Sequence, residues 1–325
     1  TMNAMMRDAL TGTLIDRFGG QADIQKRVIR HVDERTFRRD PLRAIRAAQF
    51  AARLEFAIAP ETMALCRTLD LGGLARERVM GEMEKALTRS GRPSRCFEAL
   101  REMGQLEPWL KEVAALIGVK QRADCHPEGD AWTHTMLVVD EAAKLRDEAK
   151  NPTGLMLAAL LHDVGKAVAM QEKDGVIHAY GHETAGVPLA EDFLRRLMGE
   201  KALCRYVLNM VELHMKPNMY AAQNSGQKAW NRLFDRSACP EDLLLLAKAD
   251  HRGRINAAPY AEAERTIRTR LSAYEEMMAR PHITGADLLA RGIQPGEEMG
   301  RLLEEAHRLR LAGVKKEDAL RQMRL

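Results

Sequence analysis

The chain has 325 residues, of which 46% are hydrophobic and 30% are charged, a composition typical of a globular protein with room for two or three domains. Its 50 Lys and Arg residues against 46 Asp and Glu residues give a net charge of +4, so overall charge does not indicate a nucleic-acid partner. Five scattered cysteines without a CxxC pair argue against a zinc ribbon or a disulfide framework. The longest apolar run, residues 155–161, is too short to span a bilayer. We therefore expect a cytoplasmic protein with no membrane partner.

Strand signals are confined to the first three dozen residues. Leu14 and Ile15 follow the turn signal Thr11-Gly12, and a second apolar stretch covers residues 28–32. A basic segment overlaps this region, because residues 25–46 contain eight Lys and Arg residues against three acidic ones. Such a segment can face phosphate, although the solvated face of a helical protein is the commoner explanation.

From residue 40 onward, apolar residues recur at three- and four-residue spacing, which predicts helices. Asp40-Pro41 marks the start of one helix, since proline is favoured at the first helical position. The predicted apolar face of this helix consists of Leu42, Ile45, Ala48 and Ala52. The predicted fold class is therefore mainly all-α, with a small β portion at the N-terminus and a helical bundle further along the chain.

The stretch LLHDVGK, residues 160–166, places a polar pair at the end of an apolar helix. This helix should begin at residues 151–154, and it is apolar all round over residues 155–161, which predicts a position in the core. Adjacent helical residues point about 100° apart, so His162 and Asp163 can both lean toward one ion. Lys166 shares a face with His162, where a cation would suit a phosphate substrate.

Two further helices are expected to deliver groups of the same kind. The apolar run 243–246 leads to Asp250, and His134 stands at the head of another apolar helix. Two imidazoles and two carboxylates make a mixed nitrogen and oxygen site suited to Mn²⁺, Fe²⁺, Co²⁺, Ni²⁺ or Zn²⁺, with Mg²⁺ less naturally served by imidazole. The sequence thus predicts a divalent metal site, and it leaves open whether one or two ions bind.

The order of these residues resembles the HD superfamily of metal-dependent phosphohydrolases, in which HDVGK is a specific form of the central motif. GHETAG at residues 181–186, VELH ending at His214 and AKAD ending at Asp250 belong to the same pattern. The resemblance implies that the ion is held by His134, His162, Asp163 and Asp250. It also implies that His182 and His214 contact a substrate phosphate or hold a second ion, the alternative being capping or surface histidines. Lys166 would donate to the negative charge that develops during hydrolysis.

Residues 1–87 contain TMNAMM with LTGTLIDRFGG, then RRDPLRAIRAAQFAARLEF, then ERVMGEMEKAL. These stretches resemble the later half of the head and the neck of class II tRNA nucleotidyltransferases, the CCA-adding enzymes and bacterial poly(A) polymerases. HPEGD and ITGADLLARGIQPG are similar to the bacterial members that carry an HD domain. The resemblance therefore covers nearly the whole chain, and it implies tRNA as a partner.

By this resemblance, Asp40 and Arg43 read the base of an incoming CTP or ATP, because a carboxylate accepts and a guanidinium donates hydrogen bonds at a base edge. An N-cap before Pro41 is the alternative role for Asp40, and it is compatible with the first. The family usually has an acidic residue where this chain has Arg39.

The motif that carries out nucleotidyl transfer in that family is missing from residues 1–325. The sequence contains no Gly-Ser dipeptide and no DxD or DxE, which the family needs to hold two metal ions. We therefore expect a fragment or truncated form that cannot add CCA by itself. The predicted division is a palm remnant over 1–35, a helical neck with RNA and nucleotide binding over 36–121, an HD phosphohydrolase domain over 122–255 and a tRNA-contacting helical tail over 256–325.

Two functions fit this sequence. The first is a member of the tRNA 3′-end processing family that retains a metal-dependent HD phosphohydrolase acting on a phosphomonoester or a 2′,3′-cyclic nucleotide. The second is a non-catalytic tRNA-binding module with a vestigial HD site. The complete set of His and Asp residues favours the first, because buried carboxylates without partners cost several kcal/mol.

Overall fold

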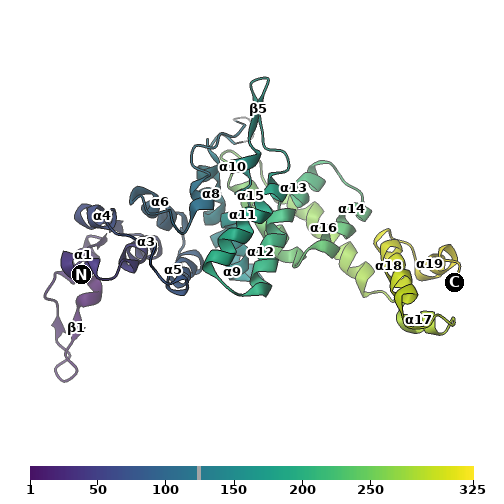
Figure 1. The fold of residues 1–325 in the computed structure, drawn as a ribbon, viewed down its shortest axis with the longest axis horizontal. Coiled ribbons are helices and arrows are strands. Elements are labelled where there is room, and N and C mark those ends of the chain that lie inside the picture. The colour runs from purple at the N-terminus through teal and green to yellow at the C-terminus, as the bar shows by residue number, and fades with distance from the viewer. Residues whose placement is uncertain (123–125) are drawn as a thin grey trace.

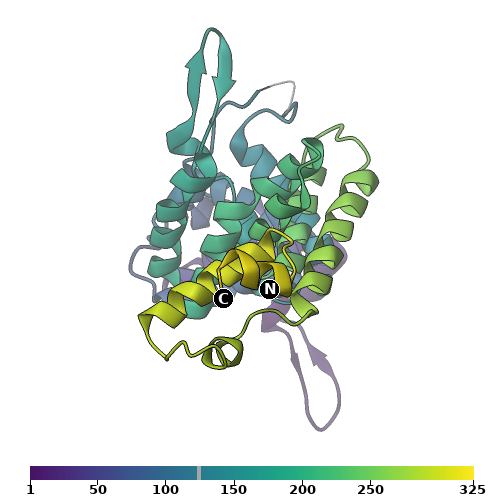
Figure 2. The same cartoon turned by 90° about the vertical axis from the view of Figure 1, so that its right-hand side faces the viewer.

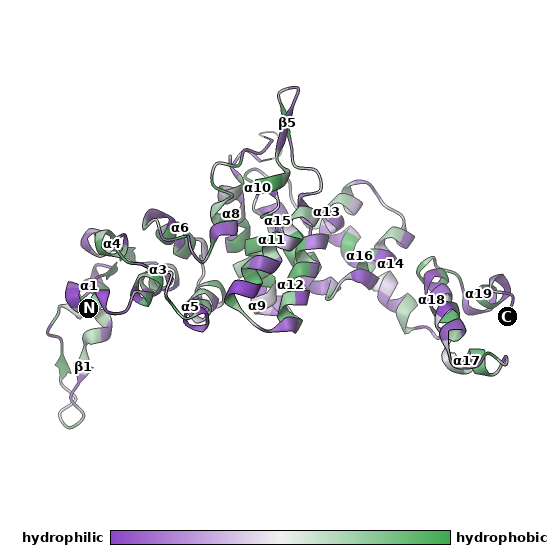
Figure 3. Cartoon of the chain, in the orientation of Figure 1, coloured by the Kyte–Doolittle hydropathy of each residue, from purple (hydrophilic) through white to green (hydrophobic). Residues whose placement is uncertain are grey.

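The computed structural model describes residues 1–122 and 126–325 and is mainly helical, which confirms the predicted fold class. In Figure 1 a central bundle of helices lies between N-terminal elements at one end and the last helices at the other. Figure 2 shows two hairpins that project from the molecule in opposite directions. Hydrophobic residues are concentrated in the helices of the central bundle, whereas the hairpin that contains β5 is hydrophilic (Figure 3).

The N-terminal end combines short strands with short helices. Strands β1 (Met6–Arg7) and β2 (Leu14–Ile15) form an antiparallel hairpin, and β3 (Val28–Ile29) pairs in parallel with β4 (Ala57–Ile58). The remaining elements are η1 (Met2–Ala4), α1 (Gly20–Gln25) and α2 (Glu34–Arg38).

The next five helices connect this end to the bundle: α3 (Leu42–Leu54), α4 (Pro60–Cys66), α5 (Arg76–Arg89), α6 (Ser94–Glu102) and α7 (Lys111–Ala114). Helix α3 packs against α5 and α6. Its predicted apolar face is confirmed, because these residues are buried: Leu42, Ile45, Ala48 and Ala52. Pro41 precedes α3 as its N-cap residue and does not occupy the first helical position.

The central bundle is built around α9 (Pro152–Leu161), which is buried from Gly154 to Leu161 and packs against α5, α8, α12 and α15. The Asn151 side chain accepts a hydrogen bond from the Gly154 N–H and so caps this helix. The predicted core helix is thereby confirmed. The other elements of the bundle are α8 (Ala131–Leu145), η2 (Arg146–Glu148), α10 (Lys166–Ala169), α11 (His182–Leu197), α12 (Lys201–Leu213), α13 (Met215–Ala222), α14 (Gln227–Arg236) and α15 (Pro240–Arg252).

The prediction that strands are confined to the start of the chain is wrong. Strands β5 (Gln171–Lys173) and β6 (Val176–His178) form an antiparallel hairpin between α10 and α11. Asp174 and Gly175 form its turn, both with φ near the left-handed region, at 53° and 74°. An Asp-Gly turn of this kind favours a two-residue hairpin, even where the strands lack hydrophobic alternation.

The C-terminal region has a small hydrophobic core of its own. Helix α16 (Ala261–Ala279) packs against α13, α14 and α15 of the bundle. Beyond it, α17 (Gly285–Leu289), α18 (Glu297–Leu311) and α19 (Lys316–Gln322) surround a second cluster of buried residues: Ile283, Leu288, Met299, Ala306 and Ala319. The main hydrophobic core is a single cluster of buried residues, the first of which is Ile29 and the last Leu271. The predicted division at residues 121 and 122 adjoins residues 123–125, which lie outside the described residues.

Among the residues that the structure describes, no helix combines the length and the apolar character needed to cross a lipid bilayer. Four cysteines are free thiols, namely Cys66, Cys96, Cys204 and Cys239, while Cys125 lies outside the described residues. Burial raises the pKa of Cys96 to about 12.

Candidate metal centre

Four histidines and two aspartates converge inside the central bundle. His134 comes from α8, and His162 and Asp163 follow the last residue of α9. His182 is the first residue of α11, His214 lies between α12 and α13, and Asp250 is near the end of α15. All six side chains are buried, at 6% exposure or less. The structure therefore brings together the six His and Asp residues that the sequence analysis singled out.

Asp163 lies at the centre of this cluster. Its Oδ1 atom is 3.1 Å from Nε2 of His182 and 3.7 Å from Nε2 of His214. Its Oδ2 atom is 3.2 Å from Nε2 of His162 and 3.8 Å from Nε2 of His134. The Nε2 atom of His134 also lies 3.1 Å from Oδ1 of Asp250. One carboxylate thus separates two pairs of imidazoles.

Backbone carbonyls fix the orientation of three of the imidazole rings. The Nδ1 atoms of His162, His182 and His214 lie 2.7 to 2.9 Å from the carbonyl oxygens of residues 159, 179 and 211. Since a carbonyl only accepts, each Nδ1 carries the proton and each Nε2 is left as a ligand atom that faces Asp163. A metal-ligating histidine is usually oriented by such an outer hydrogen bond.

Glu128 orients the fourth imidazole, that of His134, in place of a backbone carbonyl. Its Oε1 atom lies 2.8 Å from Nδ1 of His134 and 2.8 Å from Nδ1 of His126. Burial raises the pKa of Glu128, but the hydrogen bond from His134 and the other hydrogen bonds outweigh it and lower the pKa to about 2. The sequence analysis missed Glu128 as a functional residue, although the HPEGD stretch that contains it was already noted.

The cluster fits a divalent cation, because two of its atoms lack hydrogen bonds within the part of the chain that the structure describes. Nε2 of His162 is buried without a partner, as is Oδ2 of Asp163. Nζ of Lys166 lies only 2.6 Å from that oxygen, so the contact is an ion pair without hydrogen-bond alignment. Two groups of possible ligands share Asp163: one with His134 and His162, the other with His182 and His214. Imidazole and carboxylate together suit first-row divalent ions.

The charges around Asp163 and Asp250 keep both carboxylates ionised. Burial raises the pKa of Asp163, but the imidazole of His162 and the ammonium of Lys166 hold it well below its usual range. For Asp250, burial again raises the pKa, and the contact with Nε2 of His134 together with the nearby Arg254 more than reverses this effect. Burial lowers the pKa of His214 to about 3, so this imidazole is neutral and can act as a ligand.

A cavity of about 200 Å³ opens beside the cluster and is lined by Asp163, Asp250 and His182. The basic side chains of its wall come from four residues: Lys120, Arg122, Lys166 and Arg254. Nζ of Lys166 also donates to Oε1 of Gln121 at 2.6 Å. A wall with this charge suits a phosphate group. Sequence reasoning found Lys166 and missed the other residues of the wall, whose approach depends on tertiary packing.

Asp40 and Arg43 are close in sequence, but their side chains have different hydrogen-bond partners. Oδ2 of Asp40 accepts a hydrogen bond from Arg78 of α5 at 2.8 Å, and the guanidinium of Arg43 donates to the carbonyl of Thr36. Arg43 lines a cavity of about 420 Å³ in the N-terminal end, and Asp40 is not among the residues that line it. Burial raises the pKa of Asp40, but the hydrogen bond from Arg78 and the backbone N–H of Leu42, the first residue of α3, are among the groups that lower it below its usual value.

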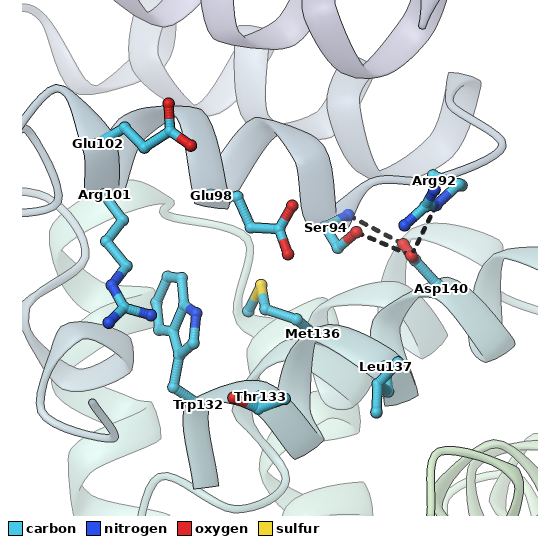
Figure 4. Close-up of a pocket in the computed structure, with 10 residues that line it drawn as sticks. All are labelled: Arg92, Ser94, Glu98, Arg101, Glu102, Trp132, Thr133, Met136, Leu137 and Asp140. Carbon is cyan, nitrogen blue, oxygen red and sulfur yellow. Dashed lines mark hydrogen bonds and ion pairs between the residues drawn. The ribbon is translucent and has the colours of Figure 1, made fainter. Parts of the chain in front are cut away.

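A further cavity of about 440 Å³ lies between α6 and α8 (Figure 4). At one end, Asp140 accepts hydrogen bonds from the N–H and the hydroxyl of Ser94 at 2.9 and 2.7 Å. At the other end, the guanidinium of Arg101 lies 5.5 Å from the ring of Trp132. The buried polar atoms without partners, among the described residues, belong to other parts of the chain.

Comparisons with known proteins identify the families that this chain resembles. Residues 131–255 match the family model of the HD domain, and residues 55–117 match that of a probable RNA and SrmB-binding site of polymerase A. The "Multifunctional CCA protein" of Burkholderia cenocepacia (strain HI2424) is 40% identical over 332 residues, which cover 97% of this chain and 76% of that protein.

Solved structures share the fold. A CCA-adding enzyme with ATP aligns with a TM-score of 0.63 and 17% identity, over 99% of this chain and 69% of that one. The Thermotoga maritima CCA-adding enzyme complexed with tRNA-CCA aligns with a TM-score of 0.61 and 17% identity, over 99% of this chain and 72% of that one.

Proposed function

This chain belongs to the family of multifunctional CCA proteins, and on that premise we propose that it takes part in tRNA 3′-end processing and carries a metal-dependent phosphohydrolase in its HD domain. The membership confirms the family that the HDVGK motif and the N-terminal stretches predicted. The phosphohydrolase activity itself is our inference from the site.

One observation carries the proposal: four imidazole Nε2 atoms surround a buried, ionised carboxylate beside a basic cavity. Three of the rings are held by backbone carbonyls and the fourth by Glu128, so the ligand atoms are already oriented. Orienting six buried polar groups toward one point is costly unless they have a ligand there. The two ligand groups that share Asp163 favour two ions over one.

A divalent cation held by His134, His162, Asp163 and Asp250 would supply Lewis acidity to a phosphoryl oxygen, with His182 and His214 holding a second ion. The residues of this chain bind and orient the phosphate. Lys166 and the basic wall donate to its non-bridging oxygens and offset their charge. In the hydrolysis, the oxygen of water bonds to phosphorus, the ester P–O bond breaks, and the departing oxygen takes up a proton. Suitable substrates are a phosphomonoester or a 2′,3′-cyclic nucleotide.

Binding of tRNA and of CTP or ATP is proposed for the N-terminal half. Its support is the match of residues 55–117 to an RNA-binding family and the position of Arg43 on a cavity. Asp40 would join Arg43 at a base edge, because its contact with Arg78 occupies only one of its two carboxylate oxygens. Since residues 1–325 contain no Gly-Ser dipeptide and no DxD or DxE, we propose that they do not add CCA by themselves.

The test is hydrolysis of a 2′,3′-cyclic nucleotide and of a phosphomonoester with added Mn²⁺, Ni²⁺, Co²⁺, Fe²⁺ or Mg²⁺. We expect metal-dependent turnover that falls by at least about 100-fold in the double variant His162→Ala, Asp163→Ala. His307→Gln changes a histidine outside the cavity and should retain full turnover. Folding of each variant is checked by circular dichroism. A folded wild type without turnover on either substrate would instead favour a tRNA-binding module with a vestigial HD site.

A further inference from the structure

The ammonium of Lys166 is held between two oxygen atoms at the edge of the metal centre. Nζ lies 2.6 Å from Oδ2 of Asp163 and 2.6 Å from Oε1 of Gln121. The contact with Asp163 is an ion pair without hydrogen-bond alignment, so Gln121 is the only side chain among the described residues that accepts a hydrogen bond from this ammonium. All three side chains are largely buried. The position of the charge therefore depends on Gln121.

The two partners of Lys166 differ in what they can do beside a divalent ion. Asp163 belongs to both groups of possible ligands, and an ion bound to its carboxylate would repel a nearby ammonium. The carboxamide of Gln121 is neutral. It accepts from Lys166 without adding a negative charge that would oppose a phosphate group. A glutamine is thus suited to hold a lysine between a metal ion and an anion.

The backbone next to Gln121 is anchored to the start of α8. Lys120 forms an antiparallel bridge with Asp130, the N-cap residue of that helix. Oδ2 of Asp130 also accepts a hydrogen bond from the N–H of Gly118 at 2.7 Å. The same helix carries His134 in its first turn. Gln121 is therefore placed relative to the metal centre by the helix that supplies one of its ligands.

Apart from Lys166, the carboxamide of Gln121 has no hydrogen-bond partner among the described residues. Its Nε2 atom is buried and unpaired within that part of the chain. An unpaired buried N–H is unfavourable, and a hydrophobic side chain of the same size would avoid it. Packing alone therefore does not account for a glutamine at this position. What the carboxamide provides is the acceptor for Lys166.

We propose that Gln121 is a positioning residue, which holds the ammonium of Lys166 where the substrate phosphate binds. Both residues line the cavity beside Asp163. With one N–H directed to Oε1 of Gln121, the ammonium keeps further N–H groups for phosphoryl oxygens. This inference rests on the proposed function, and it adds a residue that acts through Lys166 and not on the phosphate itself.

The experiment is a double-mutant cycle on the full chain, with inorganic phosphate as the ligand in isothermal titration at saturating Mn²⁺. Gln121→Met removes the acceptor at similar volume and should weaken phosphate binding by about 3- to 12-fold, the usual contribution of one hydrogen bond. Lys166→Met should weaken it by at least about 10-fold, because a charged donor is lost. In the Lys166→Met background, Gln121→Met should cause less than about a twofold further loss, because the side chain through which Gln121 acts is gone.

Two controls separate positioning from a general effect of the substitution. Gln49→Met changes another buried glutamine, in α3 and outside this cavity, whose Nε2 also lacks a partner among the described residues. This variant should retain the phosphate affinity of the wild type. The same cycle is measured in urea unfolding, which gives the coupling between Gln121 and Lys166 even where Lys166→Met binds too little phosphate to titrate.

Equal phosphate affinity in wild type and Gln121→Met would overturn the inference, as would a folded wild type that binds no phosphate. Additive losses in the two single variants would also overturn it, since a merely structural effect of Gln121 persists without Lys166. Turnover of a phosphomonoester is measured separately. Hydrolysis with no effect of Gln121→Met on phosphate binding rejects the inference and keeps the function. A coupled effect on phosphate binding in a protein that hydrolyses no substrate keeps the inference and rejects the phosphohydrolase.

Discussion

Glu128 should determine the affinity of the metal centre although it is not expected to touch the ion. Its side chain is fully buried, and its Oε1 atom lies 2.8 Å from Nδ1 of His134. Outer partners of ligating histidines typically contribute 10- to 100-fold to metal affinity, because they fix the tautomer and raise the basicity of the ring. Two substitutions at this position separate the contribution of the hydrogen bond from that of the negative charge.

Glu128→Gln keeps an acceptor oxygen and loses the negative charge, so we expect the lower end of that range, a loss of about 10-fold or ~1.4 kcal/mol. Glu128→Ala also removes the acceptor and leaves Nδ1 of His134 and His126 without this partner. For this variant we expect the upper end, a loss of about 100-fold or ~2.7 kcal/mol.

The assay is competition between the protein and a chelator for Mn²⁺ or Ni²⁺, followed by elemental analysis of the dialysed protein. Glu172→Gln serves as the matched control, because Glu172 is exposed on β5 and its substitution should leave the dissociation constant unchanged. Identical metal affinity in wild type, Glu128→Gln and Glu128→Ala would refute the assignment of Glu128 as the residue that orients His134 toward an ion.

Two further predictions concern the scaffold of the site. Gly165→Ala should destabilise the protein by more than ~3 kcal/mol in urea denaturation and impair metal binding, because the added Cβ would lie 2.0 Å from the carbonyl oxygen of His182. Gly300 lies in α18 with open space around it, so Gly300→Ala should instead stabilise the protein by ~0.5 to 1 kcal/mol. Equal effects of the two substitutions would contradict this reasoning. Asp242→Ala should cost ~3 kcal/mol in the same assay, since Asp242 is buried and accepts hydrogen bonds from Tyr206 and from two backbone N–H groups at the start of α9. A cost under ~1 kcal/mol would argue against that network.

The His and Asp cluster could be found from the sequence because several of its residues stand at the ends of unusually apolar helices. Helix α9 is apolar all round, so its position in the core was predictable, and polar residues at its end had to meet other polar groups there. The same reasoning led to Asp250 at the end of a second apolar run. Hydrophobic periodicity is a strong signal when a helix is buried on every side.

The cavity wall and the hairpin were not predictable in the same way. Lys120, Gln121 and Arg254 are polar residues whose sequence neighbours give no sign that they face one cavity. Strand β5 reads Gln-Glu-Lys and is exposed throughout, so it lacks the alternation by which a strand is recognised. Its only local signal is the Asp-Gly turn that follows it. Contacts set by tertiary packing between distant polar residues leave little trace in the local pattern.

The glycines of HDVGK and GHETAG explain how the two motifs act together. A Cβ on Gly165 would lie 2.0 Å from the carbonyl oxygen of His182 and 2.5 Å from the backbone nitrogen of Gly186. The two backbones can approach this closely only where Gly165 has no side chain. The approach fixes the start of α11 against the end of the HD stretch, and Nε2 of His182 comes to lie 3.1 Å from Oδ1 of Asp163. The β5–β6 hairpin occupies the chain between the motifs, and the contact at Gly165 holds His182 next to Asp163 on the near side of that hairpin.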